Sequence, residues 1–459
     1  MKLVVIGGDA AGMSAASQAR KRSGVDDLQI TVFERGHFTS YSACGIPYWI
    51  GGHVTDRAAL ITRTPQEFAK QDIDVRLRHE VTGIDLDRRE VVARRVDGPA
   101  GEIREGFDHL MYAAGAVPVT PPWPGVDARG VFGVQTLDDG AAIHAWLDAH
   151  PAPRRAVVIG GGYIGVEMAE AMVRRGLDVT LLEKSPEPMS TVDPDMGARV
   201  RKAILGLGIA IRTNAHVHGI ETTDGRVRAV RTPDDELPAD IVVLGLGVRP
   251  NTTLAADAGI PLGETGGLRT DLRMRLLGGG RLDGVWAAGD CVESVHRISG
   301  RPVHVPLGTH ANKQGRVAGI NIGGGYATFP GVIGTAVTKV CELEVARTGL
   351  TEHEARAAGY AYVTASVEST SRAGYYPGAA TMTIKLIAEK RTGLLLGAQI
   401  VGREEAAKRI DALAVAVWNQ MTVEEMTGLD LSYAPPFAPV WDPVLIAARK
   451  ATDAVHATH

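Results

Sequence analysis

The sequence has few cysteines, few aromatic residues and no long apolar runs, and each shortage excludes a class of protein. Its three cysteines, Cys44, Cys291 and Cys341, are too few and too widely spaced for a disulfide framework or a zinc site. Aromatic residues make up 5% of the chain, so the core must be built from Ala, Val, Ile and Leu. No apolar stretch approaches the roughly 18 residues that a membrane-spanning helix needs. We therefore expect a cytoplasmic protein, which also fits free thiols.

An excess of charge of either sign is also absent. The chain has 49 Lys and Arg residues against 53 Asp and Glu residues, a formal net charge of −4. This balance predicts neither nucleic acid nor an acidic membrane as a partner. Hydrophobic residues at 45% and charged residues at 22% are ordinary for a globular protein. The length of 459 residues predicts about three domains.

Glycine, by contrast, is abundant at 55 residues, and some of it gathers in a turn close to the start of the chain. The apolar run 3–6 predicts a strand of a parallel sheet, and the Ala-rich segment 10–19 predicts a helix. A second strand is predicted at 29–33 and ends at Glu34. The segment is therefore a β-α-β unit with glycines in its first turn.

The same unit recurs further along the chain. Residues 156–159 predict a strand, 166–175 a helix, and 178–182 a second strand that ends at Glu183. From about residue 330, Val- and Thr-rich runs (332–347, 361–370, 380–388 and 394–401) alternate with turn residues and predict an antiparallel sheet, and helical segments are expected within 404–427. We therefore expect an α/β protein with two Rossmann-like dinucleotide-binding domains and an α+β C-terminal domain.

Glycine-rich turns of this kind bind dinucleotides. Without side chains the backbone approaches a pyrophosphate closely, and the helix N-terminus offers unpaired N–H groups. An acidic residue about 20 positions further on accepts hydrogen bonds from the ribose hydroxyls. The second unit has the whole pattern. Its predicted NAD(P)H-binding residues are Gly160, Gly162, Tyr163, Ile164, Gly165 and Glu183.

The first unit departs from the pattern at one position. It reads Gly-Gly-Asp-Ala-Ala-Gly over 7–12, so Asp9 replaces the middle glycine. A downstream Ala-x-Gly-Asp segment at 287–290 supports a second nucleotide site. Two such sites in one chain indicate an electron relay, most simply from a nicotinamide to a flavin. The predicted FAD-binding residues are Gly7, Gly8, Ala11, Gly12, Glu34, Arg35, Gly115 and Asp290.

The identity of the nicotinamide nucleotide is only partly determined by the sequence. Glu183 favours NADH, because a carboxylate repels the 2′-phosphate of NADPH. Lys184 follows it and softens this preference, so NADPH stays possible.

Cys44 lies just after the first unit, in the segment Ser-Tyr-Ser-Ala-Cys-Gly-Ile-Pro-Tyr over 40–48. A lone cysteine is often a small buried apolar residue. Here Gly45 and Pro47 place it at a bend, among small and polar neighbours that leave it reachable. Cys291 and Cys341 are interpreted as packing residues.

The 40–48 segment resembles that of the single-cysteine branch of the pyridine nucleotide-disulfide oxidoreductases, which includes coenzyme A-disulfide reductases, NADH oxidases, NADH peroxidases and persulfide reductases. The resemblance also rests on the segment 287–290, on 330–334, and on the tyrosine-containing segments 374–378 and 433–437. It implies a homodimer. The implied domains are an FAD-binding domain at 1–118 and 247–329, an NAD(P)H-binding domain at 150–246 and a dimerisation domain at 330–459.

The resemblance also implies how Cys44 works. Family members with a redox disulfide place a second cysteine five positions away, where this chain has Thr39 and Trp49. Cys44 would therefore cycle alone, through a mixed disulfide or a sulfenic acid. A thiolate beside the flavin leads us to expect a lowered thiol pKa.

The acceptor is also inferred from the resemblance. Peroxidases and many oxidases of the family carry a histidine in the first glycine-rich turn, where this chain has Ala10. Coenzyme A-disulfide reductases use tyrosines of the partner subunit, and Tyr375 and Tyr433 match them, although both could simply pack at a dimer interface. The predicted coenzyme A contacts are Arg20, Arg22, Ser40 and Trp441. The two arginines could equally belong to a solvated helix end.

The sequence thus predicts an FAD-dependent NAD(P)H:disulfide oxidoreductase, with coenzyme A disulfide as the expected substrate and no metal. An NADH oxidase or a persulfide or polysulfide reductase is the first alternative. A redox-sensing flavoprotein with little turnover is an alternative of a different class. The identity of the disulfide stays open.

Overall fold

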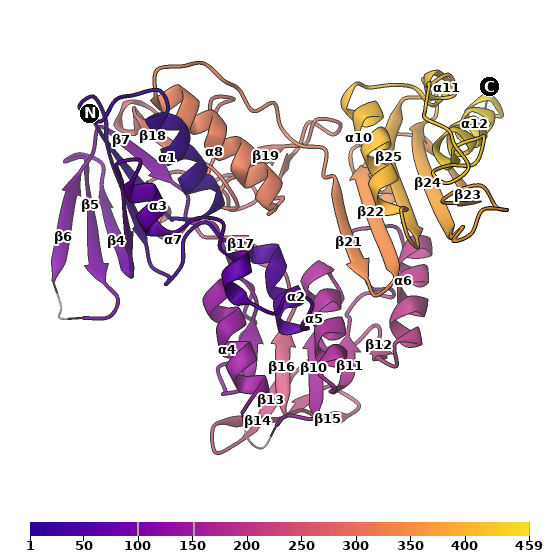
Figure 1. Ribbon diagram of the computed structural model, residues 1–459, viewed down its shortest axis with the longest axis horizontal. Helices are drawn as coiled ribbons and strands as arrows, with labels where there is room; N and C mark the ends of the chain where they lie inside the picture. The colour runs from indigo at the N-terminus through magenta and orange to yellow at the C-terminus, as the bar shows by residue number, and fades with distance from the viewer. Residues whose placement is uncertain (99–100, 150–151, 459) are drawn as a thin grey trace.

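The computed structural model of the chain describes residues 1–98, 101–149 and 152–458 (Figure 1). Figure 1 shows three sheet-containing units: an N-terminal unit in indigo and salmon, a second in purple and pink, and a C-terminal unit in orange and yellow. Among the described residues, no helix is long and apolar enough to cross a membrane.

The N-terminal unit is built on a parallel sheet with the strand order β18-β7-β1-β2-β3. Its strands are β1 (Lys2–Ile6), β2 (Gln29–Glu34), β3 (Ile73–Leu77), β7 (His109–Tyr112) and β18 (Val285–Ala287). The apolar run 3–6 is buried, as expected for a strand covered on both faces. Because β18 pairs with β7, the segment near residue 285 returns to the first unit after the chain has built the second.

Two helices pack closely against each other on this sheet. α1 (Ala10–Arg20) is rich in alanine, and α8 (Gly308–Ile322) meets it through Gly315 and Gly319. A Cβ at either glycine would lie 2.2 Å from a carbonyl oxygen of α1, that of Ala11 or of Ala15. Small residues on both helices therefore permit a close approach that larger side chains would block.

The second unit has the parallel strand order β12-β11-β10-β16-β9. Its elements are β9 (Val131–Gly133), α4 (Leu137–Leu147), β10 (Arg155–Ile159), α5 (Tyr163–Arg174), β11 (Asp178–Leu182), α6 (Pro194–Gly206), β12 (Ala210–Arg212) and β16 (Ile241–Leu244). β9 pairs with β16 although it precedes residue 150, so this unit takes in residues before the expected limit. The exact domain limits stay a prediction.

The C-terminal unit is an antiparallel sheet with the order β21-β22-β25-β24-β23, as the alternating runs predict. Its elements are β21 (Ala336–Val340), β22 (Leu343–Gly349), α9 (Glu352–Ala357), β23 (Tyr362–Thr370), β24 (Thr381–Glu389), β25 (Leu395–Gly402), α10 (Ile410–Trp418), α11 (Val423–Met426) and α12 (Pro443–His456). The edge strand β21 lies against α5 of the second unit, and β23 forms the opposite edge.

Smaller antiparallel sheets complete the fold. They are formed by β4 (His79–Asp85), β5 (Glu90–Arg95) and β6 (Glu102–Gly106); by β13 (Gly219–Thr223), β14 (Arg226–Arg231) and β15 (Glu236–Pro238); by β8 (Ala116–Pro118) and β17 (Val248–Pro250); and by β19 (Ser294–Val295) and β20 (Pro302–Val303). β8 and β17 lie where the chain passes from the first unit to the second and where it returns, and they pair with each other. The short helices are η1 (Ala43–Gly45), α2 (Ile46–Ile50), η2 (Arg57–Leu60), α3 (Pro65–Ala69), α7 (Thr253–Asp257), η3 (Gly280–Leu282) and η4 (Ala407–Arg409).

Candidate active site

The first glycine-rich turn joins β1 to α1. Gly7 has a φ of +100°, and a Cβ there would lie 2.2 Å from the carbonyl oxygen of Ala113. A Cβ at Gly12 would lie 1.9 Å from the carbonyl oxygen of Gly7. The Gly8 amide donates a hydrogen bond of 2.8 Å to Oε2 of Glu34. Gly7 and Gly12 are therefore required by the turn itself, whether or not a ligand is bound.

The second turn, between β10 and α5, repeats this geometry. Gly160 has a φ of +102°, and a Cβ at Gly165 would lie 1.8 Å from the carbonyl oxygen of Gly160. The Gly161 amide donates to Oε2 of Glu183 at 2.6 Å, and the Ser185 amide donates to Oε1 at 2.7 Å. The acidic residue that ends each second strand thus holds its own turn in place. The sequence analysis assigned these carboxylates to ribose alone and missed their hydrogen bonds to the turn amides. The two roles are compatible, because each carboxylate oxygen keeps a lone pair for a ribose hydroxyl.

Gly162 differs from its neighbours in the second turn. It stands before the first residue of α5 in extended backbone, with a φ of −77°. A Cβ added there would meet no heavy atom of the described residues within 4 Å. The turn therefore leaves the helix N-terminus open where a pyrophosphate would bind, and the residues present fit a dinucleotide. Tyr163 and Ile164 follow in the first turn of α5.

Asp9 occupies the position in the first turn that corresponds to Gly162 in the second. Its Oδ1 accepts a hydrogen bond of 3.2 Å from the Tyr41 amide, so the carboxylate joins the turn to the segment that leads to Cys44. Burial raises the pKa of Asp9 to about 7, and the charges of Glu34 and Asp290 add to the rise. The sequence left the effect of Asp9 open.

We expect Asp9→Asn to change how stability depends on pH. The pKa of Asp9 is higher in the folded protein than in the unfolded chain. The stability that protonated Asp9 contributes is therefore fully present below about pH 4 and is lost as pH rises through about 7. Asparagine removes this titration. Between pH 5 and pH 8 the free energy of unfolding of the wild type should therefore fall by roughly 2 kcal/mol relative to that of the variant. The corresponding fall in melting temperature is about 2–4 °C. The exposed Asp26→Asn is the control, and identical pH profiles for wild type and Asp9→Asn would contradict the prediction.

Asp290 follows β18 and lies beside the first turn. A Cβ at the preceding Gly289 would lie 2.9 Å from that of Ala11, so the 287–290 segment meets the start of α1. Burial raises the pKa of Asp290 to about 6. Gly115 has a φ of +68° and stands in open space among the described residues, while Arg35 is exposed just beyond β2. These residues are therefore the ones that could hold an FAD.

The segment that carries Cys44 is fixed to the first turn. The Ser40 amide donates to the Gly8 carbonyl at 3.2 Å, and the Thr39 hydroxyl donates to the same oxygen. Ser40 has a φ of +47°, so the chain bends sharply there. Cys44 lies in η1, immediately before α2, and is exposed to solvent. This exposure agrees with the prediction that Cys44 is reachable, and not with the alternative of a buried packing residue.

The side chains that surround Cys44 do not lower the pKa of its thiol, so the lowered pKa expected from the neighbouring flavin stays a prediction. Desolvation raises its pKa, and the negative charges of Glu167 and Asp290 raise it further. Glu167 extends from α5, where burial raises its own pKa, and its Oε1 accepts a 2.6 Å hydrogen bond from Thr338. Sequence reasoning missed Glu167. The available signal was a carboxylate two residues after Gly165, where α5 is otherwise mostly apolar.

The other two cysteines have structural surroundings. Cys291 is fully buried, its thiol lies 3.3 Å from the Ala288 carbonyl, and burial raises its pKa to about 12. Cys341 is partly exposed between β21 and β22, and its amide donates to Glu170. These contacts agree with the packing roles predicted for both.

The predicted tyrosines lie at the far edge of the C-terminal unit. Tyr375 is in the connection between β23 and β24, at the edge opposite β21. It is 79% exposed, Tyr433 is 49% exposed, and the two are close enough to hydrogen-bond. Trp441 is 52% exposed, with the Arg449 guanidinium 4.9 Å from its ring centroid. Tyr375 and Tyr433 therefore belong to a different unit of the chain from Cys44.

The basic residues at the end of α1 have contacts of their own. The Arg20 guanidinium donates to backbone carbonyls of Ser23, Gly24, Leu28 and Asp72, at distances between 2.6 and 3.2 Å. Arg22 is exposed and donates to Gln18. Arg22 is therefore freer than Arg20 to meet a ligand.

Two dinucleotide turns in one chain allow hydride to pass from one nucleotide to the other, and a reachable cysteine fixed to the first turn can take up the electrons once it is oxidised to a disulfide. The fold and the site define an FAD-dependent NAD(P)H oxidoreductase. The chain belongs to the pyridine nucleotide-disulphide oxidoreductase family, whose model matches residues 1–315. The model of the family's dimerisation domain matches residues 335–443, which indicates a homodimer.

Individual relatives match over nearly their full length. An NAD(P)H sulfur oxidoreductase (CoA-dependent) from Pyrococcus abyssi is 39% identical, over 97% of both chains. A coenzyme A disulfide reductase from Staphylococcus haemolyticus is 30% identical, over 98% of this chain and 99% of its own. The solved structure of an NAD-dependent persulfide reductase from A. fulgidus superposes with a TM-score of 0.95 at 39% identity, over 100% of this chain and 84% of that one.

Proposed function

We propose that the protein is a coenzyme A-disulfide reductase that works through a mixed disulfide at Cys44. The observation that carries the proposal is the position of this exposed thiol, on a segment hydrogen-bonded to the first turn. With Thr39 and Trp49 at the positions of a second redox cysteine, an internal disulfide is not available. Relatives named for coenzyme A-dependent sulfur chemistry and for coenzyme A disulfide support the substrate class.

The proposed chemistry balances as follows. The Cys44 thiolate attacks one sulfur of the substrate disulfide, which forms a mixed disulfide and releases one thiolate that takes up a proton. Two electrons from NAD(P)H then cleave the mixed disulfide, which restores Cys44 and releases the second thiol. Each turnover consumes one disulfide, one NAD(P)H and one proton, and produces two thiols and NAD(P)⁺. Bound FAD would supply electron transfer from the nicotinamide to the mixed disulfide.

The remaining site residues have proposed roles in the same reaction. The second turn, with Gly160, Gly162, Gly165 and Glu183, binds NAD(P)H, and the first turn with Asp290 binds FAD. Tyr375 of the partner subunit and Tyr433 of the partner subunit hydrogen-bond to the departing sulfur and supply its proton. Their exposure and their place at the free edge of the sheet support a role across the dimer interface. Ser40, Arg22 and Trp441 contact the substrate; for Arg20 the carbonyl contacts favour a structural contribution.

A second candidate substrate is a coenzyme A persulfide. The Pyrococcus abyssi and A. fulgidus relatives, both 39% identical, are named for sulfur and persulfide chemistry, whereas the coenzyme A disulfide reductase is 30% identical. In this case the Cys44 site would deliver two electrons to the persulfide bond and release sulfide and a thiol. The same residues would serve both reactions.

The deciding experiment follows NADH consumption under anaerobic conditions with coenzyme A disulfide, with coenzyme A persulfide, or with neither, and then repeats it in air. Fast consumption that requires the disulfide supports the reductase. Faster consumption with the persulfide, accompanied by sulfide release, moves the assignment to the second candidate. Consumption only in air indicates an oxidase, and near-zero rates throughout indicate a redox-sensing flavoprotein.

A further inference from the structure

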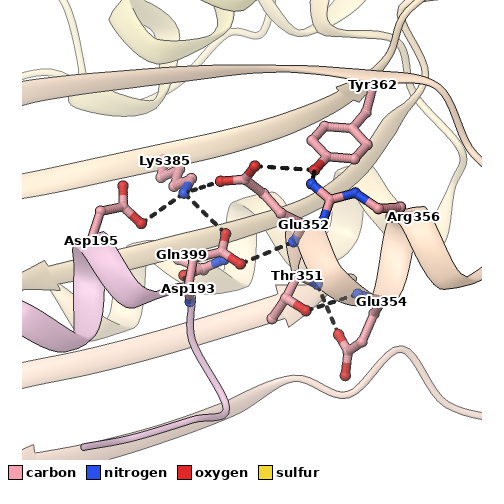
Figure 2. A network of polar contacts seen from close by, with 9 residues as sticks. All are labelled: Asp193, Asp195, Thr351, Glu352, Glu354, Arg356, Tyr362, Lys385 and Gln399. Atoms are coloured by element: carbon pink, nitrogen blue, oxygen red, sulfur yellow. Dashed lines mark hydrogen bonds and ion pairs between the residues drawn. The ribbon is translucent and has the colours of Figure 1, made fainter. Parts of the chain in front are cut away.

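A buried lysine at the junction of the second and C-terminal units has no part in the site described so far. Lys385, on β24, has a side chain that is 4% exposed. Figure 2 shows its ammonium between three carboxylates, those of Asp193, Asp195 and Glu352. The distances are 3.1, 2.7 and 2.6 Å, respectively. Three carboxylates this close could suggest a cation site, but the lysine nitrogen already occupies their centre.

Asp193 is the most buried of the three carboxylates, at 2% exposure. It ends the loop before α6, and the C-terminal unit satisfies its polar atoms. Gln399 of β25 accepts from the Asp193 amide at 2.7 Å and donates to Oδ2 at 2.6 Å, and the Glu352 amide donates to Oδ1 at 3.0 Å (Figure 2). Three elements of the C-terminal unit, β24, β25 and α9, therefore hold one residue of the second unit.

The loop that ends at Asp193 covers the second glycine-rich turn. The Met189 amide donates to the Gly161 carbonyl at 2.8 Å, and a Cβ at Gly161 would lie 3.2 Å from the Cβ of Pro188. The Thr191 carbonyl accepts from Arg347 of β22 at 2.7 Å. Tyr163 lies next to Thr191 and Arg347. The loop thus contacts the nucleotide turn at one end and is anchored to the C-terminal unit at the other.

Removing the lysine charge would release this anchor. With the ammonium gone, Asp193 would keep a buried carboxylate without its counter-charge, a change that costs far more than loss of a surface pair. Although burial opposes the charge, hydrogen bonds to Asp195 and Glu352 and the charge of Asp193 raise the pKa of Lys385. It therefore stays protonated across the range in which the enzyme would be assayed.

We propose that Lys385 is a positioning residue for NAD(P)H: through Asp193 and Gln399 it holds the 188–193 loop against the second glycine-rich turn. The inference rests on the NAD(P)H site of the proposed function and extends it, because it makes the dimerisation domain part of the support for nucleotide binding. The Lys385 ammonium is surrounded by the three carboxylates and acts on the turn only through the loop, so it should affect nucleotide affinity rather than the chemistry at Cys44.

The test compares Lys385→Met with Lys408→Met, whose side chain is 81% exposed in a surface pair with Asp411. The FAD-loaded dimer is titrated with NAD⁺ by calorimetry, and flavin reduction is followed anaerobically over a range of NADH concentrations. We expect the Kd to rise about tenfold in Lys385→Met, with the limiting rate of flavin reduction, FAD content and KM for the disulfide changed less than about twofold. Lys408→Met should match the wild type.

An unchanged Kd in Lys385→Met, with only a lower melting temperature, would overturn the inference and leave a purely structural lysine. If Lys385→Met does not fold, Gln399→Met decides in the same assays, because it removes both side-chain bonds to Asp193 without unpairing a buried charge. Failure of the proposed function gives a different result: a wild-type protein that does not bind NAD⁺ at all, or that reduces its flavin with NADH but accepts no disulfide or persulfide.

Discussion

Cys44→Ser should abolish disulfide reduction, lowering kcat roughly a thousandfold or more, while FAD and NADH still bind. The thiolate is the only group of the proposed mechanism that bonds to the substrate sulfur, and a serine hydroxyl does not undergo thiol–disulfide exchange. Removal of a nucleophile is among the most damaging single changes in an enzyme. The measurement is anaerobic NADH oxidation with coenzyme A disulfide, together with flavin reduction by NADH alone.

Cys341→Ser is the matched control for this prediction. Cys341 is also a free and partly exposed thiol, but its amide binds Glu170 at the junction with α5 and its side chain has no proposed role. It should keep nearly full turnover. Substantial disulfide reduction by Cys44→Ser would end the single-cysteine mechanism, whatever Cys341→Ser shows.

The surroundings of Cys44 indicate which groups could stabilise its thiolate. Because desolvation, Glu167 and Asp290 all raise the pKa of the thiol, the side chains nearby do not themselves favour a thiolate. In the proposed reaction, the thiolate would then be stabilised by the bound flavin and by Tyr375 and Tyr433 of the partner subunit rather than by a basic residue of this chain. A titration of the Cys44 thiol in FAD-loaded and FAD-free protein would measure the contribution of the flavin.

The parts of the site that the sequence predicted are the local ones. Gly7, Gly12, Gly160 and Gly165 are required because a Cβ would collide with backbone only a few residues away or on the neighbouring strand end, so spacing alone identifies them. The carboxylates that end the second strands follow from the same short segments. The alternating runs after residue 330 similarly predicted the antiparallel sheet, because strand periodicity is a local property.

The parts that could not be predicted depend on contacts between distant segments. Asp193 and Gln399 are 206 residues apart, and neither has a neighbour in sequence that suggests the other. Desolvation raises the pKa of the Cys44 thiol, and the charge of Glu167, which belongs to a different unit of the fold, raises it further. Tyr375 and Tyr433 were predicted by resemblance, and their position at a free sheet edge leaves their chemistry to the second subunit.

Gly162→Ala should separate nucleotide binding from folding in the second turn. A methyl group there meets none of the described protein atoms within 4 Å, and the φ of −77° suits alanine, so the protein should fold and retain FAD normally. The same methyl group would enter the space that the pyrophosphate needs at the N-terminus of α5. We expect the Kd for NADH to rise about tenfold to a hundredfold, measured by NAD⁺ calorimetry and by the concentration dependence of flavin reduction.

Two glycines of the same unit make this prediction specific. Gly206→Ala adds a methyl group at the end of α6, also in open space among the described residues, and should leave both affinity and stability near those of the wild type. Gly165→Ala places a Cβ 1.8 Å from the Gly160 carbonyl and should damage folding of the unit before any question of binding arises. A Gly162→Ala protein with unchanged NADH affinity would place the nicotinamide nucleotide away from this turn. The support that Lys385 gives the turn through Asp193 would then have no nucleotide to position. Gly162→Ala and Lys385→Met therefore test the same nucleotide site, one at the turn itself and the other at the residues that hold its covering loop.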